Sequence, residues 1–252
     1  IQGQFGGPSI QDRHDNNAGG GDTILVSGDC TENVTISKDG IRLQADGAAS
    51  ITGASTGSPV VRVRGSRTRI IGFTLTGGSN VIQIQEGGSA IIESNEISNA
   101  NSTSGILVTQ NGYARVGGTS ASRGNNIHDN SRGITVRLGS GADIFFNTID
   151  NNDRGININA NGSVDMSDNV ISNSDRGLNL LTGGTVNVSS SPATTGGANT
   201  FTNNNVAIRC RLGGSGSGGS VPVGQIDGGG NGLPLINTSG CHLSSTSVFF
   251  AP

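Results

Sequence analysis

Three stretches in the middle of the chain carry the same pattern: RGITV at residues 132–136, RGINI at 154–158 and RGLNL at 176–180. They recur every 22 residues. Each holds an apolar–x–apolar triplet, the alternation of a short β-strand that turns one side to a core. A strand of this length cannot bury that side alone, so the pattern predicts coils stacked on one another.

Asparagine stands at a fixed distance from these strands. Asn147 and Asn169 follow the Ile of the first two stretches by thirteen residues, and each precedes an x–apolar pair. Asn tolerates the left-handed backbone of a sharp bend, and identical amides one coil apart can hydrogen-bond to each other. The same frame extends in both directions, so we predict a structural ladder of Asn95, Asn125, Asn147, Asn169 and Asn199.

The repeat continues outward with some drift. The spacing of the ladder asparagines grows from 22 to 30 residues at two insertions, around 117–124 and 189–197, which fall at the same corner of the coil. We expect residues 21–212 to form the solenoid. Residues 1–20 are expected to be an N-terminal arm and weak cap, and residues 213–252 to be Gly/Ser-rich final coils and a tail of the same domain.

The opening segments GDTILV (21–26), TENVTI (31–36) and GIRL (40–43), with the Asn-x-Ile and Gly-Ile-x-Ile repeat, resemble the pectate-lyase-like superfamily. The resemblance covers roughly residues 21–212. It implies an all-β fold, a right-handed single-stranded parallel β-helix (solenoid) of about ten rungs. It is weak for function, because this superfamily holds lyases, hydrolases, esterases, epimerases, phage tailspikes and non-catalytic surface proteins.

Charge and composition argue against nucleic acid and membrane as partners. The net charge is −3, which gives no general attraction to nucleic acid. No apolar run approaches the roughly 18 residues that span a bilayer, so no membrane insertion is expected. Lys38 is the single lysine, and Ser, Thr, Asn and Gly are abundant. From this composition we expect a secreted protein, extracellular or at the cell surface.

The resemblance places an active face on the Gly-Ile-x-Ile strands. Two outward columns follow from the alternation. One runs Leu25, Arg42, Arg62, Gln83, Leu107, Thr135, Asn157, Asn179, Arg209, and the other runs Ser27, Gln44, Arg64, Gln85, Thr109, Arg137, Asn159, Leu181, Arg211. Neither column holds a carboxylate or a lysine, whereas glycoside hydrolysis needs paired carboxylates. We therefore expect no catalytic residues, and a lyase-like activity if the protein is an enzyme at all.

The same columns are rich in Arg and Gln, which suits bidentate contacts to the carboxylate or sulfate groups of an acidic polysaccharide. The candidate ligand-binding residues are Arg42, Arg62, Arg64, Gln83, Gln85, Arg137, Arg209 and Arg211. The alternative is a solvated strand face without a ligand. The scarcity of aromatic residues, 3% of the chain, favours this alternative.

Carboxylates gather elsewhere, at the turn before the repeated strand. Asp150, Asp153 and Asp175 lie there beside Arg154 and Arg176. One interpretation is a Ca²⁺ site built from oxygen ligands on adjacent rungs. The other is a ladder of Asp and Arg that neutralise one another, which we favour because Arg recurs at the neighbouring position. No other cofactor is expected.

Two aspartates, one histidine and the three cysteines lie outside these groups. Asp143 and Asp165, one coil apart, are expected to face solvent from another strand, and His128 beside Asp129 is interpreted as a turn residue. Cys210 and Cys241 are the disulfide candidate, which leaves Cys30 over.

The ends of a solenoid expose unpaired strand edges. The function we favour from the sequence is therefore a secreted, non-catalytic structural or cell-surface protein that assembles with itself end to end into filaments. A tail that folds back over the last rung would prevent this. The alternative function is binding, or lyase-type cleavage, of an anionic polysaccharide.

Overall fold

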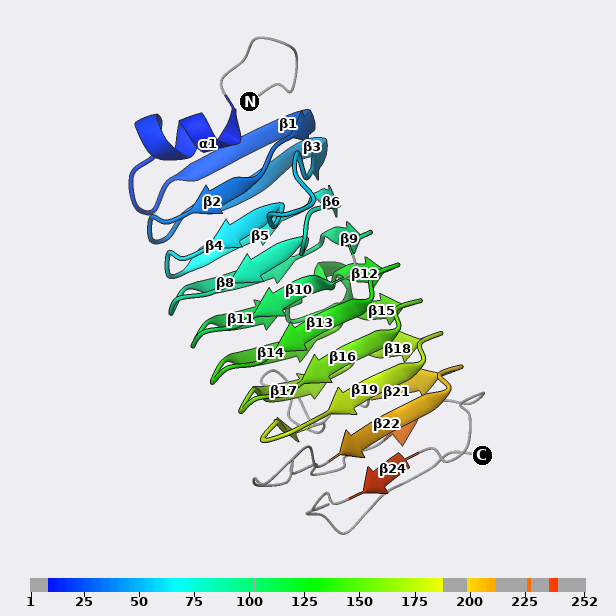
Figure 1. Ribbon diagram of the computed structural model, residues 1–252. Helices are drawn as coiled ribbons and strands as arrows, with labels where there is room; N and C mark the ends of the chain where they lie inside the picture. Colours follow the sequence, from blue (N-terminus) through cyan, green and yellow to red (C-terminus); the bar gives the residue numbers. More distant parts are fainter. Residues whose placement is uncertain (1–8, 102, 188–198, 212–225, 228–235, 240–252) are drawn as a thin grey trace.

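The computed structural model describes residues 9–101, 103–187, 199–211, 226–227 and 236–239 of the 252-residue chain. The chain winds as a stack of coils, and each complete coil adds one short strand to each of three faces (Figure 1). Consecutive coils pair in parallel, for example β10 with β13 and β13 with β16. The class is therefore a parallel β-helix, as the 22-residue repeat predicts.

One face is a nine-stranded sheet that contains the Gly-Ile-x-Ile strands. Its strands, in order along the stack, are β2 (Val34–Ile36), β4 (Val61–Val63), β7 (Ile82–Ile84), β10 (Ser104–Val108), β13 (Arg132–Val136), β16 (Arg154–Ile158), β19 (Arg176–Leu180), β22 (Val206–Arg211) and β24 (Ile236–Ser239).

The other two faces are two runs of a fifteen-stranded sheet, joined by the long strand β3 (Arg42–Thr52). β1 (Thr23–Thr31) pairs with β3. The first run is β5 (Thr68–Ile71), β8 (Ser89–Glu93), β11 (Tyr113–Val116), β14 (Gly141–Phe145), β17 (Ser163–Ser167) and β20 (Thr185–Asn187). The second run is β6 (Thr74–Thr76), β9 (Glu96–Ser98), β12 (Asn126–His128), β15 (Thr148–Asp150), β18 (Val170–Ser172), β21 (Asn199–Thr202) and β23 (Ile226–Asp227).

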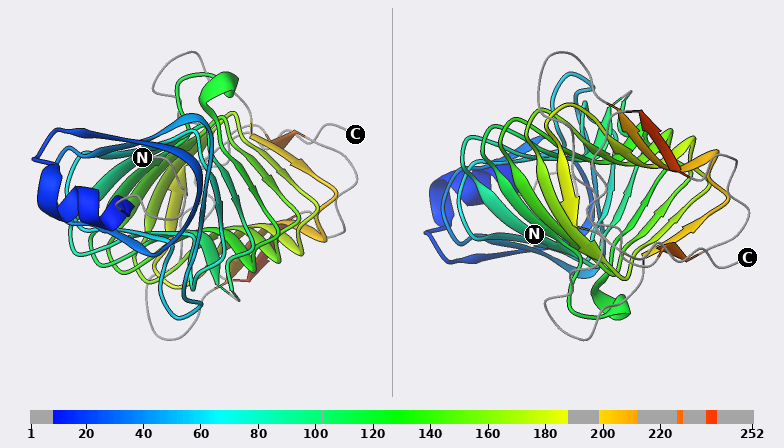
Figure 2. Two further views of the ribbon diagram at one scale, coloured as in Figure 1. Left: turned by 90° about the horizontal axis from the view of Figure 1, so that it is seen from above. Right: turned by 90° about the horizontal axis from the view of Figure 1, so that it is seen from below.

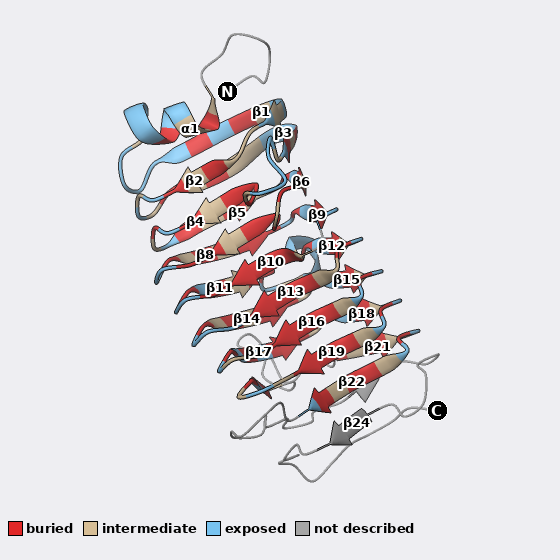
Figure 3. Ribbon diagram, viewed as in Figure 1, coloured by how far each residue is buried: buried red, intermediate tan, exposed pale blue. Residues whose placement is uncertain are grey.

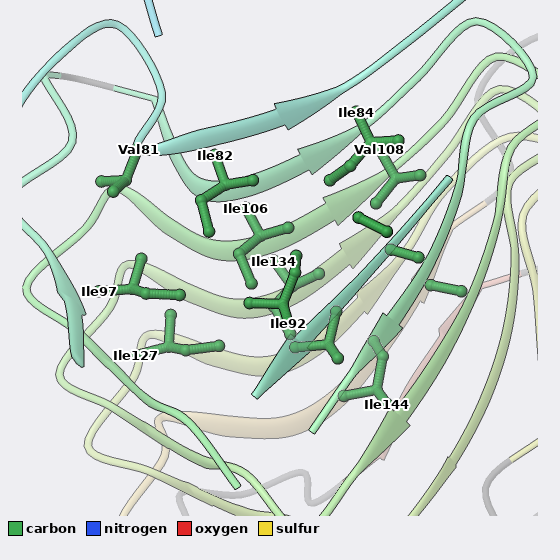
Figure 4. Close-up of a cluster of buried hydrophobic side chains, with 14 of the residues drawn as sticks. Val81, Ile82, Ile84, Ile92, Ile97, Ile106, Val108, Ile127, Ile134 and Ile144 are labelled. Atoms are coloured by element: carbon green, nitrogen blue, oxygen red, sulfur yellow. The ribbon is translucent and has the colours of Figure 1, made fainter. Parts of the chain in front are cut away.

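The core is a set of apolar columns inside the stack. Register pairing places Ile82, Ile106, Ile134 and Ile156 at one level of successive coils, and all four are fully buried. Figure 4 shows the first three of them within the core. The strands β10, β13, β16 and β19 are buried along almost their whole length, whereas strands such as β4 and β7 alternate between buried and half-buried residues (Figure 3). Burial of each such side chain contributes roughly 1.5–3 kcal/mol, so the stack depends on coil-to-coil contact.

The ladder asparagines are hydrogen-bonded to one another at the corner between the two runs. The amide of Asn95 donates to Asn125 at 3.0 Å, Asn125 to Asn147 at 2.8 Å, Asn147 to Asn169 at 3.0 Å and Asn169 to Asn199 at 2.8 Å. Each oxygen also accepts from the backbone N–H of the preceding ladder residue, as Asn147 does from Asn125 at 3.0 Å. These amides are buried, so each one satisfies backbone groups that water cannot reach.

The backbone reason we gave for this ladder is wrong. At Asn95, Asn147 and Asn169 the left-handed residue is the one before the asparagine: Ser94 with φ 57°, Phe146 with φ 60° and Asp168 with φ 58°. The asparagines four residues after the ladder, such as Asn151 and Asn173, are the ones with positive φ, at 49° and 50°. Asn151 precedes a second corner amide, Asn152, which accepts a hydrogen bond from the side chain of Asn130 at 3.2 Å. Asn173 precedes Ser174 at the same corner.

The glycine of the repeated strand has a packing role. A Cβ at Gly133 would lie 2.6 Å from the carbonyl oxygen of Gly155, and one at Gly155 would lie 2.6 Å from that of Gly177. Real Cβ atoms do not approach backbone oxygens this closely, so a larger residue would push the coils apart.

The N-terminal end is covered by the chain itself. The short helix α1 (Ile10–Asp12) runs into a π-helical turn (Arg13–Asn17) that lies on the first coil (Figures 1 and 2). Ile10 and His14 are buried there. Glu32 accepts hydrogen bonds from the backbone of Ile10 and Gln11 at 3.0 and 3.1 Å. At the C-terminal end of this helical segment, Lys38 donates to carbonyls of the turn, including those of Asp15 and Ala18 at 3.0 and 2.8 Å. The weak cap expected within residues 1–20 is thus a hydrogen-bonded element, while residues 1–8 lie outside the described residues.

The cysteines divide as follows. Cys30 on β1 is a free thiol and Cys210 on β22 is disulfide-bonded. Cys241, like the Gly/Ser-rich segment around it, lies outside the described residues.

We predict that Asn147→Ala lowers the free energy of unfolding by about 3 kcal/mol, because several buried groups lose their partners at once. The side chain accepts from Asn125 and donates to the carbonyls of Val116 and Phe145 at 2.9 and 3.0 Å. Thr148→Ala, the next residue and exposed, should change stability by no more than about 0.5 kcal/mol. Urea denaturation of both variants measures the difference, and equal midpoints would contradict the role of the ladder.

Candidate ligand-binding groove

The outward column of the nine-stranded sheet is mostly the predicted one. Register pairing aligns Thr35, Arg62, Gln83, Leu107, Thr135, Asn157, Asn179 and Arg209. The first members of both predicted columns are wrong. Leu25, Ser27, Arg42 and Gln44 lie on β1 and β3 in the other sheet, where Arg42 pairs with Arg69. The apolar–x–apolar triplets of these first strands match those of the nine-stranded sheet, so alternation alone does not separate them.

A groove of about 350 Å³ crosses the middle of this sheet, over β10, β13, β16 and the turns that follow β13, β16 and β19. Leu107, Thr135 and Asn157 form its floor. Arg132 and Arg154 stand at the start of the strands. The remaining lining residues are Asn80, Thr103 and Ser104 towards the N-terminal end and Arg137, Asn159 and Leu181 where the strands end.

The polar residues at the centre of this outward column are almost hidden from solvent. Thr135, Asn157 and Asn179 are 4%, 2% and 1% exposed, although they point away from the core. Asn179 donates to the side-chain oxygen of Asn157 at 2.6 Å, and Ser104 and Thr135 share a hydrogen bond of 2.8 Å. Within the described residues, the side-chain oxygens of Asn179 and Thr109 have no hydrogen-bond partner. Neither residue lines the groove, but Thr103 does, and its buried hydroxyl also has no hydrogen-bond partner among the described residues. A ligand that contacts Thr103 could supply that partner.

Three arginines, Arg132, Arg154 and Arg176, follow one another along the stack, and we call them the arginine wall. Arg132, Arg154 and Arg176 are in register on three consecutive rungs. Burial lowers the pKa of Arg132, and the nearby charges of Arg154 and Arg137 lower it further. Arg209 on the next rung behaves in the same way, since burial and then Arg176 lower its pKa. These arginines therefore repel one another.

The carboxylates at the preceding turn do not neutralise this wall. In the part of the chain that the structure describes, Arg176 is the one wall residue with an ion pair, to Asp175 at 3.2 Å. Asp153 instead accepts from Ser131 at 3.1 Å, and Asp150 accepts from Ser172 at 2.6 Å. The alternating Asp–Arg ladder that we favoured is thus formed at one rung only.

The Ca²⁺ interpretation gains no support from this turn. Among the residues described, His, Cys, Asp and Glu do not gather in a group of three or more that could hold a metal ion. Asp150 and Asp175 are each held by an amide on the following rung, at 2.6 Å from Asn173 and 3.2 Å from Asn205.

The structure separates the predicted binding residues into groups. Arg64 is paired with Glu86 at 3.1 Å, and Gln85 also donates to Glu86, so these side chains are engaged. Gln83 donates to Gln85. Arg62, on β4, lies beside Gln83, on β7. Arg209 and Arg211 lie on β22, beyond the groove. Of the eight candidates, Arg137 is the one that lines the groove.

The candidate residues predicted from the sequence did not include Arg132 and Arg154, which line the groove, and Arg154 was assigned to the charge ladder. The signal was present, because an arginine precedes the glycine in all three central repeats. Alternation along the strand does not show which way the side chain of this arginine points, since the register skips Gly133 and resumes at Ile134.

The groove lining suits anion binding. Guanidinium groups offer paired donors to carboxylate or sulfate, and the half-buried lining residues Thr103 and Asn159 can exchange hydrogen bonds with sugar hydroxyls. Among the described residues that line it, there is no carboxylate, histidine or lysine. The lining therefore lacks the paired carboxylates that glycoside hydrolysis requires.

His128 lies outside this groove, on β12 in the second run. Its Nδ1 is 2.6 Å from Asp129 and its Nε2 is 3.3 Å from Glu96. Partial burial lowers the pKa of His128, but the hydrogen bonds to Asp129 and Glu96 raise it, and the net shift is upward. The ring is thus a partner for two carboxylates across neighbouring rungs.

The chain belongs to a known family. Residues 59–248 match the family described as the right-handed β-helix region. Among solved structures, the crystal structure of pectate lyase Pel9A is similar, with a TM-score of 0.61 and 14% sequence identity over 98% of this chain and 70% of that chain. At this identity the likeness shows the fold alone. No curated protein matches the chain. No helix in the described residues is long and apolar enough to cross a membrane.

We predict that His128→Asn lowers stability more at about pH 5 than at about pH 8. The folded protein holds the proton more tightly, so the ion pairs contribute fully below the unfolded pKa and are lost as pH rises through the folded pKa. The difference should stay under about 1 kcal/mol because the site is partly exposed. Urea midpoints of both proteins at the two pH values test this, and a larger loss at high pH would contradict it.

Proposed function

We propose that the groove on the nine-stranded sheet binds an anionic polysaccharide. The observation that carries this proposal is the register of Arg132, Arg154 and Arg176 on consecutive rungs, with an ion pair at Arg176 alone among the described contacts of these three. Like charges so close together destabilise the unliganded protein, and a line of anionic groups would remove that repulsion.

A polymer fits this wall better than a small anion. Rungs repeat at about 4.8 Å, so the arginines form a line of regularly spaced donors along the stack. A polysaccharide with carboxylate or sulfate groups on successive sugars presents a matching line of acceptors. Thr103 and Asn159 also line the groove and are half-buried, so their side chains can exchange hydrogen bonds with sugar hydroxyls.

We propose binding without cleavage, because the described lining residues supply neither a paired acid and base nor a lysine. An extracellular location, expected from the low lysine content and polar surface, agrees with such a ligand. Assembly through the solenoid ends is less well supported. The hydrogen-bonded cap from Ile10 to Asn17 lies over the first coil, and a neighbouring molecule would have to displace it.

The test compares two double variants with the same loss of charge. Arg137→Ala/Arg154→Ala should reduce affinity for polygalacturonate or dextran sulfate at least about tenfold, since each charge-assisted contact contributes about 1.5–3 kcal/mol. Arg13→Ala/Arg67→Ala removes two exposed arginines away from the groove and should bind nearly as wild type. Affinity electrophoresis in gels containing either polymer measures the change.

Binding by the wild type should weaken as salt is added, because the contacts are ionic. Wild-type protein that is not retarded by either polymer would overturn the proposal. Equal losses in the two double variants would also overturn it, since they would show attraction to net charge and not to the groove.

A further inference from the structure

A second surface with different chemistry lies on the first run of the fifteen-stranded sheet, across the turn at residues 137–140 that joins β13 to β14. Tyr113 on β11 is in register with Gly141 on β14, and Arg115, Asp143 and Asp165 are in register on β11, β14 and β17. We call Tyr113, Arg115, Asp143 and Asp165 the tyrosine patch. None of the four lines the groove.

The Tyr113 ring is held in a fixed position and is open to solvent. Its hydroxyl donates to Asp143 Oδ2 at 2.6 Å. A Cβ at Gly141 would lie 3.2 and 3.5 Å from Cδ2 and Cε2 of the ring, so the ring packs over the backbone of Gly141. The residue nevertheless remains 45% exposed, so the ring side away from Gly141 is available for contact.

The polar groups around the ring have unused hydrogen-bonding capacity. Within the described residues, Asp143 makes one side-chain hydrogen bond, to Tyr113, and Asp165 on the next rung makes none. Arg115 forms no ion pair in this part of the chain, and its buried Nε has no partner. The patch therefore presents carboxylate acceptors and a guanidinium donor beside an aromatic face.

We propose that the tyrosine patch binds a sugar residue of a neutral polysaccharide, stacked on Tyr113 and hydrogen-bonded through its hydroxyls to Asp143, Asp165 and Arg115. An aromatic ring supplies rigid contact area for the apolar face of a sugar, and ionised carboxylates accept from hydroxyls. The two aspartates repel uronate and sulfate groups, so the ligand is neutral, unlike that of the groove.

The protonation state of the ring agrees with this role. Burial, followed by the hydrogen bond to Asp143 and the charges of Asp143 and Asp165, raises the pKa of Tyr113. The phenol therefore keeps its proton and stays bonded to Asp143 throughout the neutral range.

Tyr113 also makes the experiment specific. The chain has one tyrosine and no tryptophan, so tyrosine fluorescence reports on the patch alone. Cellohexaose, xylohexaose and mannohexaose are each titrated into the folded protein. We expect a saturable fluorescence change with at least one of them. Asp165→Asn should weaken it about tenfold, the loss typical of one hydrogen bond to a charged group.

The matched control is Asp46→Asn, which removes one exposed aspartate away from the patch and should bind as wild type. By isothermal titration calorimetry, Tyr113→Phe should retain most of the affinity and Tyr113→Ala should lose it. Arg137→Ala/Arg154→Ala should bind the neutral sugars unchanged, which separates this proposal from that for the groove.

Three results would overturn the inference. One is no fluorescence change with any of the three neutral sugars. Another is equal binding by Asp165→Asn and wild type. The third is a response to chitosan oligomers alone, which would show that the aspartates attract positive charge and do not recognise neutral hydroxyls.

Discussion

Parallel pairing of each coil with the next, in a fixed register, is the constraint on which the rest of this structure depends. A slip of one residue would turn every outward side chain of a strand inward. The buried amides prevent such a slip, because Asn125, Asn147 and Asn169 each bond to the equivalent residue one coil away. The same register aligns Ile134 with Ile156 in the core. It also aligns like-charged side chains outside, so the arginine wall is a direct consequence of a repeat that keeps the core in place.

Much of the fold could be predicted because its determinants repeat. The Gly-Ile-x-Ile strands and the ladder asparagines recur every 22 residues in the central coils, and the two wider intervals are insertions at one corner. The first coils could not be assigned in this way. Leu25 and Arg42 lie in triplets that alternate like the others, and the path of β3 from one run to the other depends on contacts between coils.

The groove was harder to predict than the fold, for a different reason. The position of a side chain along a strand follows from periodicity, but its partner depends on where the side chain lies in three dimensions. Arg64 has the same place in the repeat as Arg137, yet Glu86 pairs with the first and Arg137 lines the groove. Asp153 is adjacent to Arg154 in sequence, yet it accepts from Ser131 on the preceding coil.

The net charge of −3 conceals an uneven surface. Arginines line the groove, whereas aspartates dominate the tyrosine patch on another face of the same coils. The two surfaces are joined by the short turn between β13 and β14, so both are held by one rigid stack. A surface that is already ordered loses less conformational entropy on binding, which is an advantage for binding extended polymers.

The constant length of the central coils has a consequence for how such a molecule changes in evolution. Residues 132–153 form one 22-residue unit with its own wall arginine, floor residue and corner amides. Tandem duplication of this unit would insert one complete rung. The rungs on either side of it would pack against surfaces equivalent to those that they contact now. The groove would lengthen by one charge at a time, and its avidity for a long chain would rise with copy number. The length of ligand that the protein can contact thus depends on the number of coils, and recombination can change that number without altering the packing of the core.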